Sequence, residues 1–259
     1  MSILEVNNLS FGYSKDSPVL KEVSFSIDAG DIFCLLGPNG SGKSTLLSQI
    51  LFPEKEIAQH LTLWEKPYGQ FSRKQRARLL SFVPQQLPAL RISVLQTVVM
   101  GRVPYMESPL LKPSAQDMQM AREVLAQLGM SELESRELHT LSGGELQRVF
   151  IAQALLKEAK LYFFDEPMAA LDPEYQTNFL KMIQNLSGKG AGVIFTSHNP
   201  NHLFAIPNAR VGILDKAHQF CRFDQMSEAA AKRMEEVFHH SMRICYSPAH
   251  GSFVAVSNL

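Results

Sequence analysis

Residues 37–44, GPNGSGKS, constrain the fold of this chain more than any other part of the sequence. They fit the pattern G-x-x-x-x-G-K-[ST] at every defined position. The continuous apolar run Ile32–Leu36 precedes them, which is typical of a fully buried strand, and a helical pattern follows. Strand, glycine-rich loop and helix in this order predict a phosphate-binding loop in an α/β domain.

The residue types in this loop suit a nucleoside triphosphate. Glycines let backbone N–H groups approach phosphate oxygens, and the following helix offers the positive end of its dipole to the same anion. We expect Lys43 to lie along the β- and γ-phosphates of ATP and the Ser44 hydroxyl to coordinate Mg²⁺. The other loop residues expected to bind ATP are Gly37, Pro38, Asn39, Gly40, Ser41, Gly42 and Thr45.

Two adjacent carboxylates follow a second apolar run. Residues 161–164, LYFF, lead directly into Asp165 and Glu166. Two acids at this place can be a solvated turn or a helix cap. Beside a phosphate loop, they predict a Mg²⁺ partner in Asp165 and, in Glu166, the group that orients and deprotonates the attacking water.

The remaining sequence pattern predicts a phosphate-loop core with an N-terminal antiparallel β subdomain and an inserted helical subdomain. Alternating residues 3–6 and 23–27 indicate antiparallel strands with a break at Gly12, and apolar runs at 192–195 and 211–214 indicate further core strands. Residues 88–160 have a helical pattern and form a candidate helical subdomain. We expect one domain over 1–224, extended over 225–259 by a helix at 227–238 and a hairpin at 243–246 and 253–256.

Composition excludes several classes. Lysine plus arginine number 25 and aspartate plus glutamate 25, so the formal net charge is zero. The chain has no overall positive charge that would attract nucleic acid, and no such partner is expected. No apolar stretch approaches the ~18 residues that cross a bilayer, so we expect a cytoplasmic protein whose membrane partner supplies any spanning helices. The three cysteines form no CxxC pair and are expected to be free, buried thiols.

Residues 141–148, LSGGELQR, identify the family. Ser142 followed three residues later by Glu145 predicts a helix N-cap. The LSGGE string between a phosphate loop and the LYFFDE segment also resembles the signature of ABC ATPases. In that family the residues matching Ser142, Gly143 and Gly144 contact the γ-phosphate of ATP held by an opposing cassette. The resemblance therefore implies a homodimer that sandwiches two ATP molecules.

The resemblance assigns further residues one by one. Tyr13 matches the aromatic that stacks on adenine, and Gln85 the glutamine that contacts Mg²⁺ and the attacking water. His198 matches the switch histidine that contacts the γ-phosphate and braces Glu166, and Asp172 belongs to the loop that crosses the dimer interface. The chain departs from the pattern at Met168, where most relatives carry a small hydroxyl residue.

Residues 78–85, 97–105 and 197–202 most resemble cassettes that serve importers of metal chelates. Such importers move ferric siderophores, haem, cobalamin or, in some members, molybdate. The resemblance implies integral membrane permease subunits, an associated substrate-binding protein, and a position on the inner face of the plasma membrane. The permease contact is expected within residues 86–105, where Leu90 and Val94 offer apolar side chains.

Three alternatives remain open from the sequence. An iron–sulfur assembly partner is also a single ABC cassette without spanning helices, and an ABC exporter subunit differs only in transport direction. A small-molecule kinase would explain the phosphate loop, but it leaves the LSGGE string and His198 without a purpose.

Overall fold

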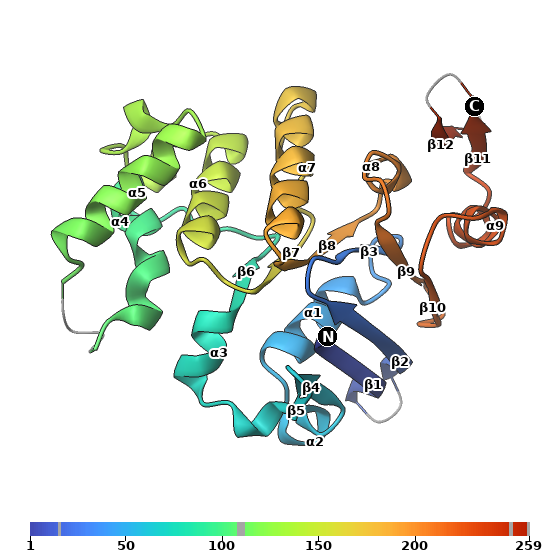
Figure 1. Cartoon of the computed structure of the whole chain (residues 1–259). Helices are drawn as coiled ribbons and strands as arrows, with labels where there is room; N and C mark the ends of the chain where they lie inside the picture. Colours follow the sequence, from blue (N-terminus) through green and yellow to red (C-terminus); the bar gives the residue numbers. More distant parts are fainter. Residues whose placement is uncertain (15–16, 108–111, 249–250, 258–259) are drawn as a thin grey trace. The chain divides into compact units, whose positions relative to one another are not determined.

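The computed structural model describes residues 1–14, 17–107, 112–248 and 251–257. The chain forms two compact units: Met1–Phe71 together with Thr177–Leu259, and Ser72–Gln176. Both contain helices and strands, which confirms the expected α/β class (Figure 1).

An antiparallel sheet forms the N-terminal part of the first unit. Its strand order is β2-β1-β4-β5, with bounds Ser2–Ser14 (β1), Ser17–Asp28 (β2), Leu61–Leu63 (β4) and Lys66–Pro67 (β5). The alternating sequence pattern predicted the first two strands. β1 continues through Gly12, which pairs with Pro18, but its register with β2 shifts on both sides of this residue, so the expected break is an irregularity of the pairing and not an interruption of the strand.

Buried parallel strands form the core of the first unit. β3 (Ile32–Leu36) pairs in parallel with β8 (Gly192–Ser197) on one side and β9 (Arg210–Leu214) on the other, and β10 (Phe220–Phe223) pairs antiparallel with β9. Every residue of β3 and β8 is buried, which explains the continuous apolar sequence of β3 and of residues 192–195 in β8. Helices of this unit are α1 (Lys43–Leu51), α2 (Lys55–Ala58), the 3₁₀ turn η1 (Tyr68–Gln70) and most of α7 (Pro173–Gly188).

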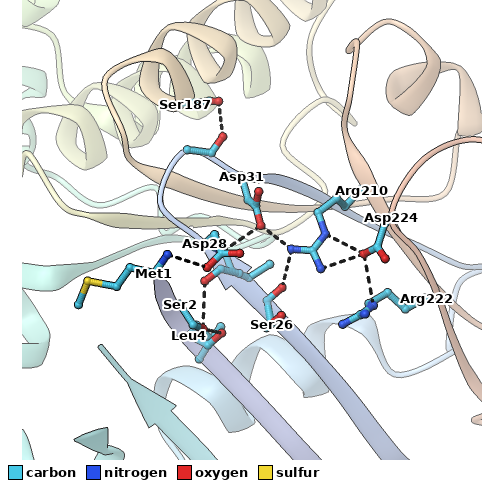
Figure 2. Close-up of polar contacts among 12 residues, drawn as sticks. Met1, Ser2, Leu4, Ser26, Asp28, Asp31, Ser187, Arg210, Arg222 and Asp224 are labelled. Atoms are coloured by element: carbon cyan, nitrogen blue, oxygen red, sulfur yellow. Dashed lines mark hydrogen bonds and ion pairs between the residues drawn. The ribbon is translucent and has the colours of Figure 1, made fainter. Parts of the chain in front are cut away.

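Arg210, at the start of β9, ties three segments of this unit together (Figure 2). Its guanidinium donates to Asp31 Oδ2 before β3, to the Ser26 carbonyl oxygen of β2 at 2.9 Å, and to Asp224 after β10 at 3.0 Å. The Arg210 side chain is only 14% exposed and that of Asp31 23%, so this ion pair is shielded from solvent.

Replacing Arg210 by alanine is expected to destabilise the protein by about 2–3 kcal/mol, because the half-buried Asp31 carboxylate loses its cation. Arg222→Ala is the matched control: Arg222 contacts the exposed Asp224 at 3.6 Å, so its loss should cost less than about 0.5 kcal/mol. Urea unfolding of the two variants and the parent measures both. Equal destabilisation by the two variants would contradict this role of Arg210.

The C-terminal elements of the first unit follow the predicted pattern. α8 (Pro200–Phe204) comes after β8, α9 (Glu228–Val237) begins after the cap Ser227, and β11 (Met242–Ser247) pairs antiparallel with β12 (Ser252–Ser257). The cysteines are free, as expected, but only Cys34 is buried. The expectation of buried thiols is wrong for Cys245, which lies exposed on the hairpin.

The second unit combines a helical cluster with two parallel strands. β6 (Leu80–Val83) pairs with β7 (Leu161–Phe164), and α4 (Val94–Val99), α5 (Ala115–Gln127) and α6 (Gly143–Leu156) pack around a shared apolar core. Val94 is fully buried in that core, so the expectation that it faces a permease is wrong, whereas Leu90 is 52% exposed. The unit also contains α3 (Arg73–Leu79) and the 3₁₀ turns η2 (Met100–Tyr105), η3 (Ser131–Leu133) and η4 (Leu138–Thr140).

In the described part of the chain, no helix combines the length and the apolar character needed to cross a membrane.

Candidate functional site

The glycine-rich loop connects β3 to α1 in the first unit. Gly37 directly follows β3, and a Cβ at this position would lie 2.2 Å from the Leu214 carbonyl oxygen, so only glycine fits beside β9. Gly42 occupies the N-cap position of α1. The predicted order of strand, loop and helix is therefore confirmed.

Lys43 and Ser41 give the loop its binding character. Lys43 is 6% exposed, and its ammonium group donates to the carbonyl oxygens of Gly37 at 2.8 Å and Pro38 at 3.3 Å. The cation thus lies within the loop rather than in solvent. The Ser41 hydroxyl is buried, and no hydrogen-bond partner for it exists among the described residues. A buried polar atom of this kind beside a buried cation fits a loop built for an anion.

Tyr13 lies beside the loop. Its hydroxyl is 3.2 Å from that of Thr45, the third residue of α1, and its ring meets Phe11 edge-on at 5.2 Å between centroids. The side chain is 76% exposed. An exposed ring next to a phosphate loop can stack on a nucleotide base, which agrees with the role that the resemblance gives Tyr13.

His198 follows β8 at the same sheet edge as the loop. Leu36 and Ser197 are paired at the ends of β3 and β8, and the Gly37 N–H donates to the Ser197 carbonyl oxygen at 3.3 Å. His198 itself is exposed. The first unit therefore brings together Tyr13, the loop of residues 37–45 and His198, as expected for a site at the carboxyl ends of parallel strands.

The second unit holds the two predicted acids and Gln85. Asp165 and Glu166 follow β7 and are 3% and 8% exposed, and the Asp165 N–H donates to the Val83 carbonyl oxygen at 2.9 Å. Gln85 comes two residues after the end of β6, which runs parallel to β7, so all three polar residues lie near one end of this strand pair.

The backbone of Glu166 is left-handed, with φ 47°. A non-glycine residue in this conformation costs about 1–2 kcal/mol, and such outliers cluster at functional sites. No local sequence pattern predicts this conformation. Nine other described non-glycine residues share a left-handed backbone, so it is the burial of Glu166, at 8% exposed, that argues against a simple solvated turn.

Ser142 caps α6 as predicted. Its hydroxyl accepts from the Glu145 N–H at 3.3 Å, and the Glu145 carboxylate accepts from the Ser142 N–H at 2.8 Å. The backbone hydrogen bond from Ser142 and then the one from its hydroxyl lower the pKa of Glu145. Because the pKa of Glu145 is lowered in the folded state, the full contribution of this interaction to folding stability is present at neutral pH. It is lost as the pH falls through the pKa of the folded state.

The loop of residues 168–172 lies against the start of α6. A Cβ on Gly144 would be 3.1 Å from the Ala170 carbonyl oxygen, so the loop passes close to the helix tip. Asp172 then caps α7, since its carboxylate accepts from the Tyr175 N–H at 3.0 Å. The second unit therefore places Ser142, Gly143, Gly144 and Asp172 near one another. Their expected contacts with a second copy stay predictions.

Two residues of this region were missed by sequence reasoning. The Gln176 side-chain amide donates to the carbonyl oxygens of Met168 at 3.2 Å and Leu171 at 3.0 Å, so it fixes the loop that carries the departure at Met168. The Arg148 guanidinium lies over the Tyr175 ring, with its central carbon 3.9 Å from the ring centroid. Asp172-Pro173 is a helix-start signal, and it could have placed Gln176 in the first turn of α7, facing its own N-terminal loop.

Comparison with known proteins agrees with this arrangement. The family model described as ABC transporter matches residues 20–169. A molybdate import ATP-binding protein of Haemophilus influenzae is 35% identical over 207 residues, covering 79% of this chain and 76% of the relative. A Helicobacter pylori protein named as an iron chelatin transport ATP-binding protein is 34% identical over 202 residues, covering 77% and 78%.

A solved structure described as a metal-chelate type ABC transporter in an inward-facing conformation resembles the whole chain. The TM-score is 0.83 at 30% identity, and the match covers 100% of this chain and 99% of the other. The family model, the relatives and the solved structure thus agree with the assignment that the phosphate loop and the capped LSGGE helix indicate. The chain belongs to the ABC transporter family, as a subunit that binds and hydrolyses ATP.

Proposed function

We propose that two copies of this chain bind MgATP between them and power an importer of metal chelates, with ferric siderophores as the favoured cargo. The observation that carries the ATP-sandwich part is the exposed N-terminus of α6, at Ser142 and Gly143. Lys43 and its loop lie in the first unit, and the exposed tip of α6 with Ser142 lies in the second. The 14-residue α6 offers the positive end of its dipole to an anion.

The chain's own residues divide the work of hydrolysis. Lys43 and the loop amides hold the β- and γ-phosphates, and Tyr13 stacks on adenine. Glu166 orients and deprotonates water, and His198 contacts the γ-phosphate and braces Glu166. Bound Mg²⁺ would neutralise phosphate charge, and Ser44, Asp165 and Gln85 supply the oxygen atoms that this ion prefers.

The Ser142 hydroxyl has two separable roles in this proposal, as helix cap and as contact to the partner's γ-phosphate. Ser142→Ala should lower stability by about 1 kcal/mol and also slow hydrolysis. Ser142→Asn should keep the cap, because asparagine caps helices as well as serine does. We expect its urea unfolding to match the parent while its kcat falls. Parental kcat in both variants would argue against the phosphate contact.

The permease subunits are proposed to dock on the second unit around residues 86–105. Leu90, Met100 and Val103 are 52%, 51% and 39% exposed there, which provides apolar surface for a helix of a partner. In this proposal the ATPase lies peripherally on the inner face of the plasma membrane. A substrate-binding protein would select the cargo on the other side and would contact only the permease.

Cargo is tested in the reconstituted transporter. The relatives' names span molybdate, manganese, zinc and iron chelate, and the solved transporter is described as of the metal-chelate type. We expect binding protein loaded with ferric siderophore to stimulate ATP hydrolysis by the complex, and molybdate-loaded protein to leave it at the basal rate. Stimulation by molybdate alone would overturn the siderophore proposal and keep the cassette assignment. Purification without any integral membrane protein would favour an iron–sulfur assembly role instead.

A further inference from the structure

The C-terminal hairpin of the first unit is bonded to the helix that follows the switch histidine. The Asn201 side chain makes two hydrogen bonds with one residue of β12: its amide group donates to the Ala255 carbonyl oxygen at 3.2 Å, and its oxygen accepts from the Ala255 N–H at 2.9 Å. The Asn201 amide therefore substitutes for one backbone unit of a neighbouring strand. This pairing joins residues 54 positions apart in the sequence.

A second contact supports the same connection. Phe204, at the end of α8, lies 6.3 Å from Phe253 of β12 between ring centroids, and Phe253 in turn meets Tyr246 of β11 edge-on at 5.7 Å. Both strands of the hairpin thus contribute to the surface that holds α8. Ile244 of β11 is also fixed, because its N–H donates to the Glu235 carboxylate of α9 at 2.6 Å.

From α8 the contacts continue to the backbone on both sides of His198. His202 Nδ1 lies 2.9 Å from Ser197 Oγ, and the Asn199 N–H donates to the same hydroxyl at 2.9 Å. The Asn201 N–H donates to the Asn199 side-chain oxygen at 3.0 Å. The exposed His198 is therefore held between two residues whose side chains are fixed by α8, and α8 is fixed by the hairpin.

We propose that Asn201 is a positioning residue for His198, and that the C-terminal hairpin braces the segment 197–204 so that the histidine is presented to the γ-phosphate. The proposal rests on the role proposed above for His198. It assigns a task to the hairpin, which lies outside residues 20–169 matched by the family model. In this proposal the hairpin does not contact ATP and acts only through the geometry of residues 197–204.

The expected kinetic result follows from the two lost hydrogen bonds. Asn201→Ala should lower kcat by about 3- to 10-fold, the effect of losing one or two neutral hydrogen bonds of ordinary strength. The affinity for ADP should stay unchanged, because ADP lacks the γ-phosphate and the loop of residues 37–45 is untouched. A role in stability alone would lower the unfolding midpoint and leave the kcat of the folded protein at the parental value.

A double-mutant cycle with His198→Ala tests whether Asn201 acts through the histidine. If it does, Asn201→Ala should have no further effect on kcat in the His198→Ala background. Phe253→Ala should behave like Asn201→Ala in both backgrounds. The matched control is Arg243→Ala, an exposed position on β11 that leaves the Asn201–Ala255 pair intact and should keep parental kcat.

Amide hydrogen exchange over residues 197–204 separates the brace from the role of His198. Faster exchange in Asn201→Ala than in Arg243→Ala is the expected result, and equal exchange would overturn the brace whatever His198 does. Parental kcat in Asn201→Ala, or an equal loss of kcat in the two backgrounds, would overturn the positioning role. If His198→Ala itself hydrolyses ATP like the parent, the proposed role of His198 fails and the positioning proposal with it, while the exchange result still decides the brace.

Discussion

Glu166→Gln is expected to bind MgATP like the parent and to lose about 100- to 10,000-fold in kcat, the contribution of a positioned general base. Glutamine keeps the shape and length of the side chain, so the loop after β7 should retain its structure. It cannot take a proton from the attacking water. With hydrolysis blocked, two copies should remain joined around ATP, so gel filtration with MgATP should show a dimer.

The control for this variant is Glu174→Gln, which removes an exposed carboxylate from the first turn of α7. It should keep parental turnover and should not accumulate a dimer. Because the buried Glu166 has a left-handed backbone, unfolding by urea should accompany the kinetics, to show that the variant is folded. A Glu166→Gln protein that hydrolyses ATP at the parental rate would refute the assigned role.

Elements with strong local patterns were predictable from the sequence. The run Ile32–Leu36 matches β3 residue for residue, because every side chain of that strand is buried and apolar. The cap of α6 was predictable because Ser142 and Glu145 complete it within four residues. β6 was not predicted: it is only four residues long, and its buried Ser81 interrupts the apolar pattern.

Contacts between distant residues could not be predicted from a single sequence. Arg210 and Asp31 are 179 positions apart, and neither has a local pattern that indicates a charged partner. Asn201 and Ala255 are similar, since nothing near Asn201 in the sequence indicates a partner 54 positions away. The left-handed backbone of Glu166 also gave no signal, because glutamate has no preference for that conformation.

The local structures of the candidate site were predictable because each depends on a short string, whereas the contacts of every site residue with ATP stay predictions. Residues 37–45 and the LSGGE string each form one local structure, and the structure places both as expected. The roles of Gln85, His198 and Asp172 came from motif order and stay predictions. These roles are tested by measuring ATP hydrolysis and dimer formation, because they concern contacts with ATP or with a second copy.

Lys43→Ala should weaken MgATP binding by about 10- to 100-fold, the effect of losing a charge-assisted hydrogen bond to phosphate. The ammonium group lies within the loop, bonded to the Gly37 and Pro38 carbonyl oxygens, and this loop is the proposed site of the phosphates. Alanine removes this cation and with it the positive charge that attracts the phosphates. Titration calorimetry measures the affinity directly.

This variant should differ from Glu166→Gln in a way that separates binding from chemistry. Lys43→Ala should fail to form the MgATP-dependent dimer, whereas Glu166→Gln should accumulate it, because the first loses the nucleotide and the second only the proton acceptor. Lys55→Ala, an exposed lysine in α2, is the matched control and should bind like the parent. Parental affinity in Lys43→Ala would show that Lys43 does not hold the phosphates. It would contradict the proposal that this loop binds ATP between two copies.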